Sequence, residues 1–203
     1  MELARLVQKL DRVRANERSP ANWNGLAMAQ RPALDPETLE AIEGRLGIRL
    51  PEEYRAYLTQ VADGGMGPGY GLYPLEEAIE RRNRTIYGLH QPFEPPRSTR
   101  ECWSDWVPGM LPLHHDGCAY YTGLVVAGPA RGSVWSYVEV APGWVPLLRP
   151  GYTDANGDPY VDPESGRDFA RWYDVLLSPA NEGFRMGFIE HLEQWADGYL
   201  AGS

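Results

Sequence analysis

The sequence predicts an α+β protein whose central antiparallel sheet, of about four to six strands, is flanked by helices at both ends of the chain. Three observations lead to this prediction. Apolar residues recur at helical spacing in the first and last parts of the chain. Between them lie short runs of β-branched and aromatic residues separated by glycine turns. Strands and helices do not alternate as a parallel sheet requires, so the α+β class fits best.

Two helices are predicted ahead of residue 50. Residues 2–16 place apolar side chains on one face, with basic and polar residues between them. These apolar residues are Leu3, Leu6, Val7, Leu10 and Val13. After a connecting loop, Asp35 is positioned to cap a helix that starts at Pro36, because Asp accepts hydrogen bonds from the first free amides and Pro suits the first turn. Gly47 is predicted to end this helix.

A third helix is predicted to begin at Pro51 and to stop at Asp63-Gly64-Gly65. Its first turn carries Glu52 and Glu53, which favour the positive end of the helix dipole. Neighbours in a first turn do not face each other, so they are not read as paired catalytic carboxylates. A glycine-rich stretch follows, and a fourth helix is predicted near Pro74. Its inward residues are Leu75, Ala78 and Ile79, and its outward residues are Arg81, Arg82 and Arg84.

Extended runs then replace the helical spacing. Strands are predicted at residues 111–113, 119–126, 133–140 and 144–148. The segments between them contain Asp116-Gly117, Gly128-Pro129 and Pro142-Gly143, which are typical of tight turns, so the strands form an antiparallel meander. Two helices are predicted to close the chain. Their apolar residues are Phe169, Trp172, Tyr173, Leu176 and Leu177 in the first, and Phe184, Phe188, Ile189, Leu192 and Trp195 in the second.

Motifs along the chain occur in a characteristic order. They are Leu50-Pro51-Glu52-Glu53-Tyr54 with Asp63-Gly64-Gly65, Gly71-Leu72-Tyr73-Pro74-Leu75, Leu111-Pro112, Asp116-Gly117-Cys118, Gly132-Ser133-Val134-Trp135, and Asp168-Phe169 with Trp172-Tyr173. Together they resemble the SUKH superfamily, which contains the fungal Smi/Knr cell-wall regulator and many bacterial immunity proteins. The resemblance covers residues 36–178 and implies a SUKH-like fold without a shared catalytic centre. We expect residues 1–203 to form one domain, with the helices at 2–16 and about 182–197 added to this core.

Composition indicates a folded protein of the cytoplasm. The chain is 43% hydrophobic and has seven Trp and twelve Tyr, enough for a core that a disordered chain lacks. The N-terminal segment has charges every few residues, unlike a secretory signal. No run of about 18 apolar residues occurs, so no membrane contact is expected. Cys102 and Cys118 are expected to be reduced thiols, with a single disulfide as the alternative.

The charge argues against nucleic acid as a ligand. The net charge is −9, whereas binding a phosphate backbone needs a clustered positive face. From Glu139 to Ser203, eleven acidic residues stand against four arginines, a net of −7. Such a segment can steer a basic protein partner, and an ordinary solvated surface is the alternative. The compact basic group Arg81, Arg82 and Arg84 is either a contact for RNA or an acidic protein, or a solvated helix face.

No metal, phosphate or nucleophile site is predicted, and no cofactor is expected. His114, His115, Asp116 and Cys118 are close in sequence, but neighbours on a strand point to opposite faces, and a structural zinc site needs about four ligands in paired spacing. The glycine-rich run at 64–71 lacks the Gly-Lys-Ser/Thr ending of a phosphate loop. Gly-x-Ser-x-Gly is absent as well. We therefore expect no enzymatic activity, with a small-molecule enzyme as the remaining alternative.

The residues predicted to bind a partner are aromatic or acidic. Trp and Tyr anchor many protein interfaces, and a loop exposes them more readily than a strand. Core packing is the alternative for the aromatic residues, above all for Trp135. The acidic candidates belong to the Gly/Asp-rich loop at 151–167. The predicted binding residues are Tyr70, Tyr73, Trp103, Trp106, Asp154, Asp158, Asp162 and Glu164.

The resemblance implies a function. It implies an immunity-type protein that binds and neutralises a toxin domain. The negative charge of the C-terminal half further suggests that this half would face a basic toxin surface. The alternative is a regulatory scaffold of the Smi/Knr type without a toxin partner. The sequence leaves the partner's identity and the oligomeric state open.

Overall fold

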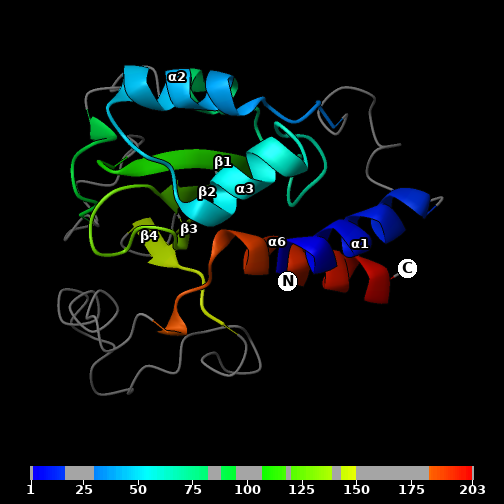
Figure 1. Ribbon diagram of the computed structural model, residues 1–203. Coiled ribbons are helices and arrows are strands. Elements are labelled where there is room, and N and C mark those ends of the chain that lie inside the picture. Colours follow the sequence, from blue (N-terminus) through cyan, green and yellow to red (C-terminus); the bar gives the residue numbers. More distant parts are fainter. Residues whose placement is uncertain are drawn as a thin grey trace, which may run out of the picture.

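A computed structural model places most of the chain. The residues that it describes are 2–16, 30–81, 88–94, 107–117, 120–138, 143–149 and 183–202. Within these ranges the chain forms five helices and one four-stranded antiparallel sheet, which confirms the predicted α+β class (Figure 1). No helix in this part of the chain is long and apolar enough to cross a membrane.

The elements follow the predicted order of helices, sheet and helix. The bounds are α1 Glu2–Ala15, α2 Pro36–Leu46, α3 Glu52–Gln60, α4 Leu75–Arg81, β1 Met110–Gly117, β2 Tyr120–Val125, β3 Val134–Val138, β4 Gly143–Pro146 and α6 Phe188–Ala201. The sheet has the strand order β1-β2-β3-β4, so each strand pairs with its neighbours in sequence and the predicted meander is confirmed.

The helix ends follow local signals. Asp35 accepts a 2.8 Å hydrogen bond from the amide of Thr38 and so caps α2. Gly47 ends α2 in the left-handed conformation, with φ 67°, which glycine adopts without a steric penalty. Asp63 follows α3 and contacts the next helix: its carboxylate accepts a 2.7 Å hydrogen bond from the amide of Leu75 at the start of α4. The carboxylate of Asp63 thus ties the end of one helix region to the beginning of the next.

The predicted turn at Asp116-Gly117 is wrong, because both residues belong to β1. The pairing of β1 with β2 is irregular between His115 and Gly117, and Gly117 still pairs with Tyr120. A bulge of this kind lets a glycine with φ 94° stay inside a strand. β1 therefore reaches further than its apolar residues alone suggested.

The last helix begins later than predicted. The sequence predicted a helix from about residue 182, but α6 starts at Phe188 and extends to Ala201. The residues before it extend the sheet instead: the amide of Val134 donates to the carbonyl of Met186 at 3.0 Å, and the amide of Met186 donates to the carbonyl of Leu147 at 2.8 Å. Phe184 belongs to this segment and not to the helix. Pairing with distant strands overrides the local helical spacing here.

The sheet separates two apolar clusters, since successive strand residues point to opposite faces. Leu111, Leu124 and Val134 face the larger cluster, which is completed by all five helices. Their neighbours Met110, Val125 and Trp135 face a smaller cluster with Phe93, Trp144 and Leu148. Trp135 is fully buried, so core packing is the correct interpretation of it, and Trp144, 4% exposed, belongs to the core as well.

The two end helices lie side by side and run in the same direction (Figure 1). Arg5 Nε donates to Glu193 at 2.6 Å, and one turn further along both helices Lys9 Nζ donates to Asp197 at 2.6 Å. Leu6, on α1, is fully buried in the larger cluster. The basic face of α1 is thus directed at an acidic face of the same chain.

Candidate functional site

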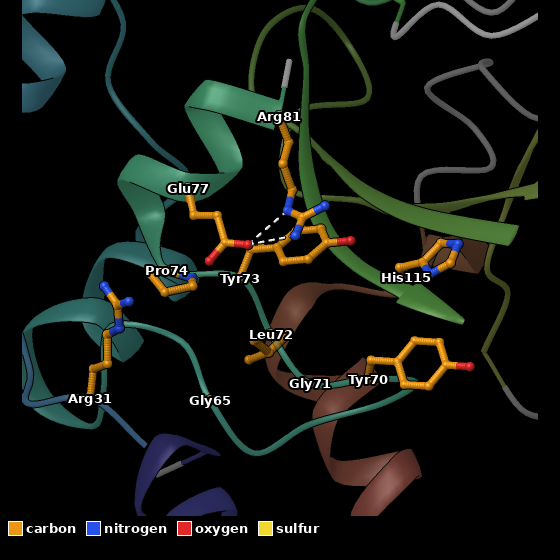
Figure 2. Close-up of a pocket in the computed structure, with 10 residues that line it drawn as sticks. All are labelled: Arg31, Gly65, Tyr70, Gly71, Leu72, Tyr73, Pro74, Glu77, Arg81 and His115. Carbon is orange, nitrogen blue, oxygen red and sulfur yellow. Dashed lines mark hydrogen bonds and ion pairs between the residues drawn. The ribbon is translucent and has the colours of Figure 1, made fainter. Parts of the chain in front are cut away.

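A pocket of about 360 Å³ lies beside the glycine-rich loop that follows α3 (Figure 2). It is lined by Arg31, Gly65, Tyr70, Gly71, Leu72, Tyr73, Pro74, Glu77, Arg81 and His115. These residues come from the segment before α2, the glycine-rich loop, α4 and β1. Two of the predicted binding residues, Tyr70 and Tyr73, meet at this pocket.

Backbone hydrogen bonds hold the loop firmly. Gly65 and Leu72 exchange two hydrogen bonds, of 2.9 and 2.7 Å, which close the loop on itself. The amide of Tyr70 donates to the carbonyl of His115 at 2.9 Å, and the amide of Tyr73 donates to the carbonyl of Leu113 at 2.8 Å. The loop therefore lies along the outer edge of β1 as a fixed wall of the pocket.

Glycine is required in this wall by positive φ and by close packing. Gly69 has φ 57°, and a Cβ there would collide with the carbonyl oxygen of His115. Gly64 has φ 83°, and a Cβ there would lie 2.6 Å from the nitrogen of Pro74. Both positions exclude an ordinary side chain on steric grounds.

Tyr70 is the most exposed large apolar side chain among the described residues, with 59% of its surface accessible. Its ring stacks on the imidazole of His115 at a centroid distance of 5.6 Å. His115 in turn contacts the ring of Tyr121 at 4.6 Å. The three rings form an aromatic row that begins with Tyr70 and His115 at the rim of the pocket (Figure 2) and ends at Tyr121, which packs against the smaller apolar cluster.

Arg81 is held in place from two sides. Its guanidinium lies 4.2 Å from the centre of the Tyr73 ring, a cation–π contact. Its Nε donates to Glu77 Oε1 at 2.8 Å, and Nη2 lies 2.7 Å from the same oxygen. Burial raises the pKa of the Tyr73 hydroxyl, and the nearby Arg81 opposes that rise. The prediction of an outward Arg81 is confirmed, but this arginine is anchored to the pocket wall and does not stand in a free basic patch.

Arg31 supplies a second cation to the pocket. Its side chain is exposed, and within the described ranges it has no ion-pair partner. The backbone beside it is tied to α3, because the amide of Leu34 donates to the carbonyl of Leu58 at 2.8 Å. The position of this residue before α2 hid it from sequence reasoning, which treated the segment as a connecting loop.

His114 points to the opposite face of β1 from His115, as the strand geometry predicted. It is 1% exposed, and its Nε2 lies 3.0 Å from Nε2 of His191 on α6. Its Nδ1 lies 3.1 Å from Oδ1 of Asp116, close in distance but poorly aligned for a hydrogen bond. Burial, together with a smaller effect of His114, lowers the pKa of His191 to about 3, while Asp116 opposes the shift. The described residues contain no group of three or more metal-ligating side chains.

The sequence model of the SMI1/KNR4 family (SUKH-1) matches residues 33–173, which is more than two thirds of the chain. The chain belongs to this family. The predicted resemblance is therefore confirmed. A search of curated proteins found no match.

In this SUKH-1 protein, α1 and α6 lie outside the matched residues and yet form part of the same core. Several carboxylates of α6 are paired within the chain: Glu193 with Arg5, Asp197 with Lys9, and Glu190 with Arg149 at 2.7 Å. The part of the acidic segment that the structure describes is thus neutralised in large measure by the chain's own cations.

The remaining predicted residues of this SUKH-1 protein fall outside the described ranges. They are the binding candidates Trp103, Trp106, Asp154, Asp158, Asp162 and Glu164, the thiols Cys102 and Cys118, the arginines Arg82 and Arg84, and the predicted helix that begins near Phe169. The site described here therefore rests on Tyr70, Tyr73 and the residues that the fold brings to them.

Proposed function

We propose that this SUKH-1 protein is a non-enzymatic binding module of the immunity type, which binds and neutralises a toxin domain. Family membership supports the proposal, because the SUKH-1 group includes immunity proteins. The observation that carries it is the exposed ring of Tyr70, stacked on His115 at the rim of a pocket. An exposed, positioned tyrosine beside a concavity is the arrangement that anchors many protein interfaces.

The loop geometry supports binding with little rearrangement. Four backbone hydrogen bonds fix the glycine-rich loop before any partner arrives: two close it on itself, and two attach it to β1. A rigid surface loses less conformational entropy on association than a mobile loop. We infer that the partner meets a preformed surface made by the loop and the edge of β1 to which it is attached.

The placement of the histidines favours binding over catalysis. His114 and His191 face each other inside the core and are 1% and 8% exposed, so a substrate does not reach them. His115, at the pocket rim, stacks on Tyr70 and makes a tilted contact with the ring of Tyr121. In that position we expect the ring to contribute contact area to a binding surface and not to act as a general acid or base.

We also propose that residues 1–203 act as a single module. The supporting observation is that side chains of α1 and α6 share one apolar cluster with α2, α3 and the sheet. The two end helices then brace the family fold, and the partner surface lies on the glycine-rich loop.

Co-expression tests the function. Bacteria that produce a toxin domain encoded beside this gene are expected to recover growth when the full chain is present, and the two proteins are expected to co-purify as a stable complex. Recovery without a complex, or no recovery with any neighbouring toxin, contradicts the proposal. A stable complex with a host protein and no recovery of growth favours the regulatory scaffold of the Smi/Knr type.

A further inference from the structure

The pocket beside the glycine-rich loop has a positive charge imbalance within an acidic protein. Its lining contains two guanidinium groups, from Arg31 and Arg81, and one carboxylate, from Glu77. The chain as a whole carries a net charge of −9. A local excess of positive charge in such a protein favours a negatively charged ligand in this pocket.

The neighbours of Arg81 use only part of its hydrogen-bonding capacity. A guanidinium has five N–H donors, and Glu77 engages Nε and Nη2 through a single oxygen atom. Nη1 has no hydrogen-bond partner among the described residues. The cation–π contact with Tyr73 keeps the group in one orientation. The free donors of Arg81 are therefore available to a ligand without a change of rotamer.

Arg31 faces the same pocket from the other side (Figure 2). It has no carboxylate partner in the described part of the chain, and its backbone segment is anchored to α3 through Leu34. The carboxylate beside this segment is that of Asp63, whose amide donates to the carbonyl of Pro32, and it accepts a 2.7 Å hydrogen bond from the amide of Leu75. Among the described residues, Arg31 is thus a cation without an ion-pair partner at the mouth of the pocket.

We propose that the pocket receives an acidic side chain of the protein partner, whose carboxylate is bound between Arg31 and Arg81. The inference rests on the proposed binding function and deepens it. Planar guanidinium groups bind carboxylates through paired, charge-assisted hydrogen bonds. Tyr70 and His115 then contact the part of the partner that surrounds this acid. At this point of the surface the partner supplies negative charge, whatever the charge of the rest of it.

The charge balance favours a carboxylate over phosphate. The lining has two positive groups and one negative group, so a single carboxylate makes the pocket neutral. A phosphate dianion would leave an excess of negative charge close to Glu77, in a protein that already repels polyanions. Phosphate binding is nevertheless a distinct outcome that the experiment separates.

The test uses the full chain, labelled with ¹⁵N, and two small probes followed by NMR. N-acetyl-glutamate N-methylamide presents the carboxylate, and N-acetyl-glutamine N-methylamide is its neutral analogue. We expect saturable shifts with the glutamate probe at the amides of Gly71, Leu72 and Tyr73 and at Arg31 Nε. The glutamine probe is expected to bind about tenfold more weakly or not at all, because it cannot form the charged pair.

Matched variants locate the effect. Arg31→Gln removes the free cation and is expected to weaken the glutamate probe about tenfold or more. Arg12→Gln removes another exposed arginine, which lies on α1 and does not line the pocket, and is expected to change nothing. Equal binding of both probes, shifts away from the pocket, or an effect of Arg12→Gln as large as that of Arg31→Gln overturns the proposal.

Inorganic phosphate is the third probe. Shifts at the pocket with phosphate and none with the glutamate probe overturn the proposal in favour of a phosphate site. No toxin is needed for these titrations. The glutamate probe can therefore fail to bind the pocket while growth rescue still succeeds. Growth rescue can equally fail while the glutamate probe binds, which separates the two proposals.

Discussion

The Nε2 atoms of His114 and His191 lie 3.0 Å apart in the core and join β1 to α6. The rings are nearly parallel, with 6° between their planes. At this distance one nitrogen donates and the other accepts, so the pair is held together only while at least one ring is neutral. The link that fixes the last helix to the sheet is therefore sensitive to protonation.

Acid is expected to destabilise the fold through His191. Burial lowers the pKa of His191 to about 3, whereas an unfolded histidine titrates near 6.5. Between these values the unfolded chain binds a proton that the folded chain does not. The free energy of unfolding should therefore fall as the pH drops below about 6.5, by at most about 1.4 kcal/mol per pH unit. Urea denaturation between pH 7.5 and pH 4.5 measures this slope.

The matched variant His191→Gln should flatten that slope, because glutamine keeps a polar side chain and does not titrate. Asp116 also titrates near this pair, but its effect falls at lower pH. Burial raises its pKa, contacts with His114 and Thr122 outweigh burial and lower it, and the resulting stabilisation is lost only as the pH falls below the ordinary carboxyl range. An unchanged slope in His191→Gln contradicts the assignment.

Glu53 caps a helix that begins far away in the sequence. Its Oε2 accepts a 3.1 Å hydrogen bond from the amide of Ile189, in the first turn of α6. Removing such a cap costs about 1 kcal/mol, so Glu53→Ala should lower the free energy of unfolding by that amount. Its neighbour Glu52 is the control, since 80% of its side chain is exposed and it makes only a loose contact with Arg49. Equal losses in Glu52→Ala and Glu53→Ala would show that the cap contributes nothing.

Features that depend on local signals could be predicted from the sequence, whereas features that depend on distant contacts could not. The cap at Asp35 and the left-handed Gly47 act within one helix turn, so their positions were readable from neighbouring residues. The start of α6 was not, because pairing of Met186 with β3 competes with the helical spacing.

The site shows the same division. Tyr70 and Tyr73 stood out because a glycine-rich loop exposes aromatic residues. Arg31 and Arg81 lie fifty positions apart and share a pocket only after α3 and α4 have packed. The partner of His114 was equally hidden, because His191 is one of several polar residues in its helix and the sequence does not distinguish it from the others. A fold was needed to bring each pair together.

Two glycines in different backbone settings should respond in opposite ways to alanine. At Gly69 a Cβ would strain φ 57° and collide with the carbonyl of His115, so Gly69→Ala should cost about 1–3 kcal/mol and detach the loop from β1. Gly44 lies on the exposed side of α2 with open space around it, so Gly44→Ala should stabilise the protein by about 0.5–1 kcal/mol. Thermal unfolding of both variants checks the signs, and a neutral Gly69→Ala is incompatible with the rigid wall described here.

The ring of Tyr70 is expected to contribute to partner affinity and little to folding. Because 59% of the residue is exposed, Tyr70→Ala should leave the unfolding midpoint almost unchanged. An aromatic anchor at an interface contributes about 2 kcal/mol or more, so the same change should weaken the complex with the toxin domain about thirtyfold. Tyr70→Phe keeps the stack on His115 and should bind nearly as tightly as the natural chain. Calorimetric titration of the three proteins distinguishes the outcomes: a Tyr70→Ala chain that binds at full strength places the partner elsewhere on the molecule.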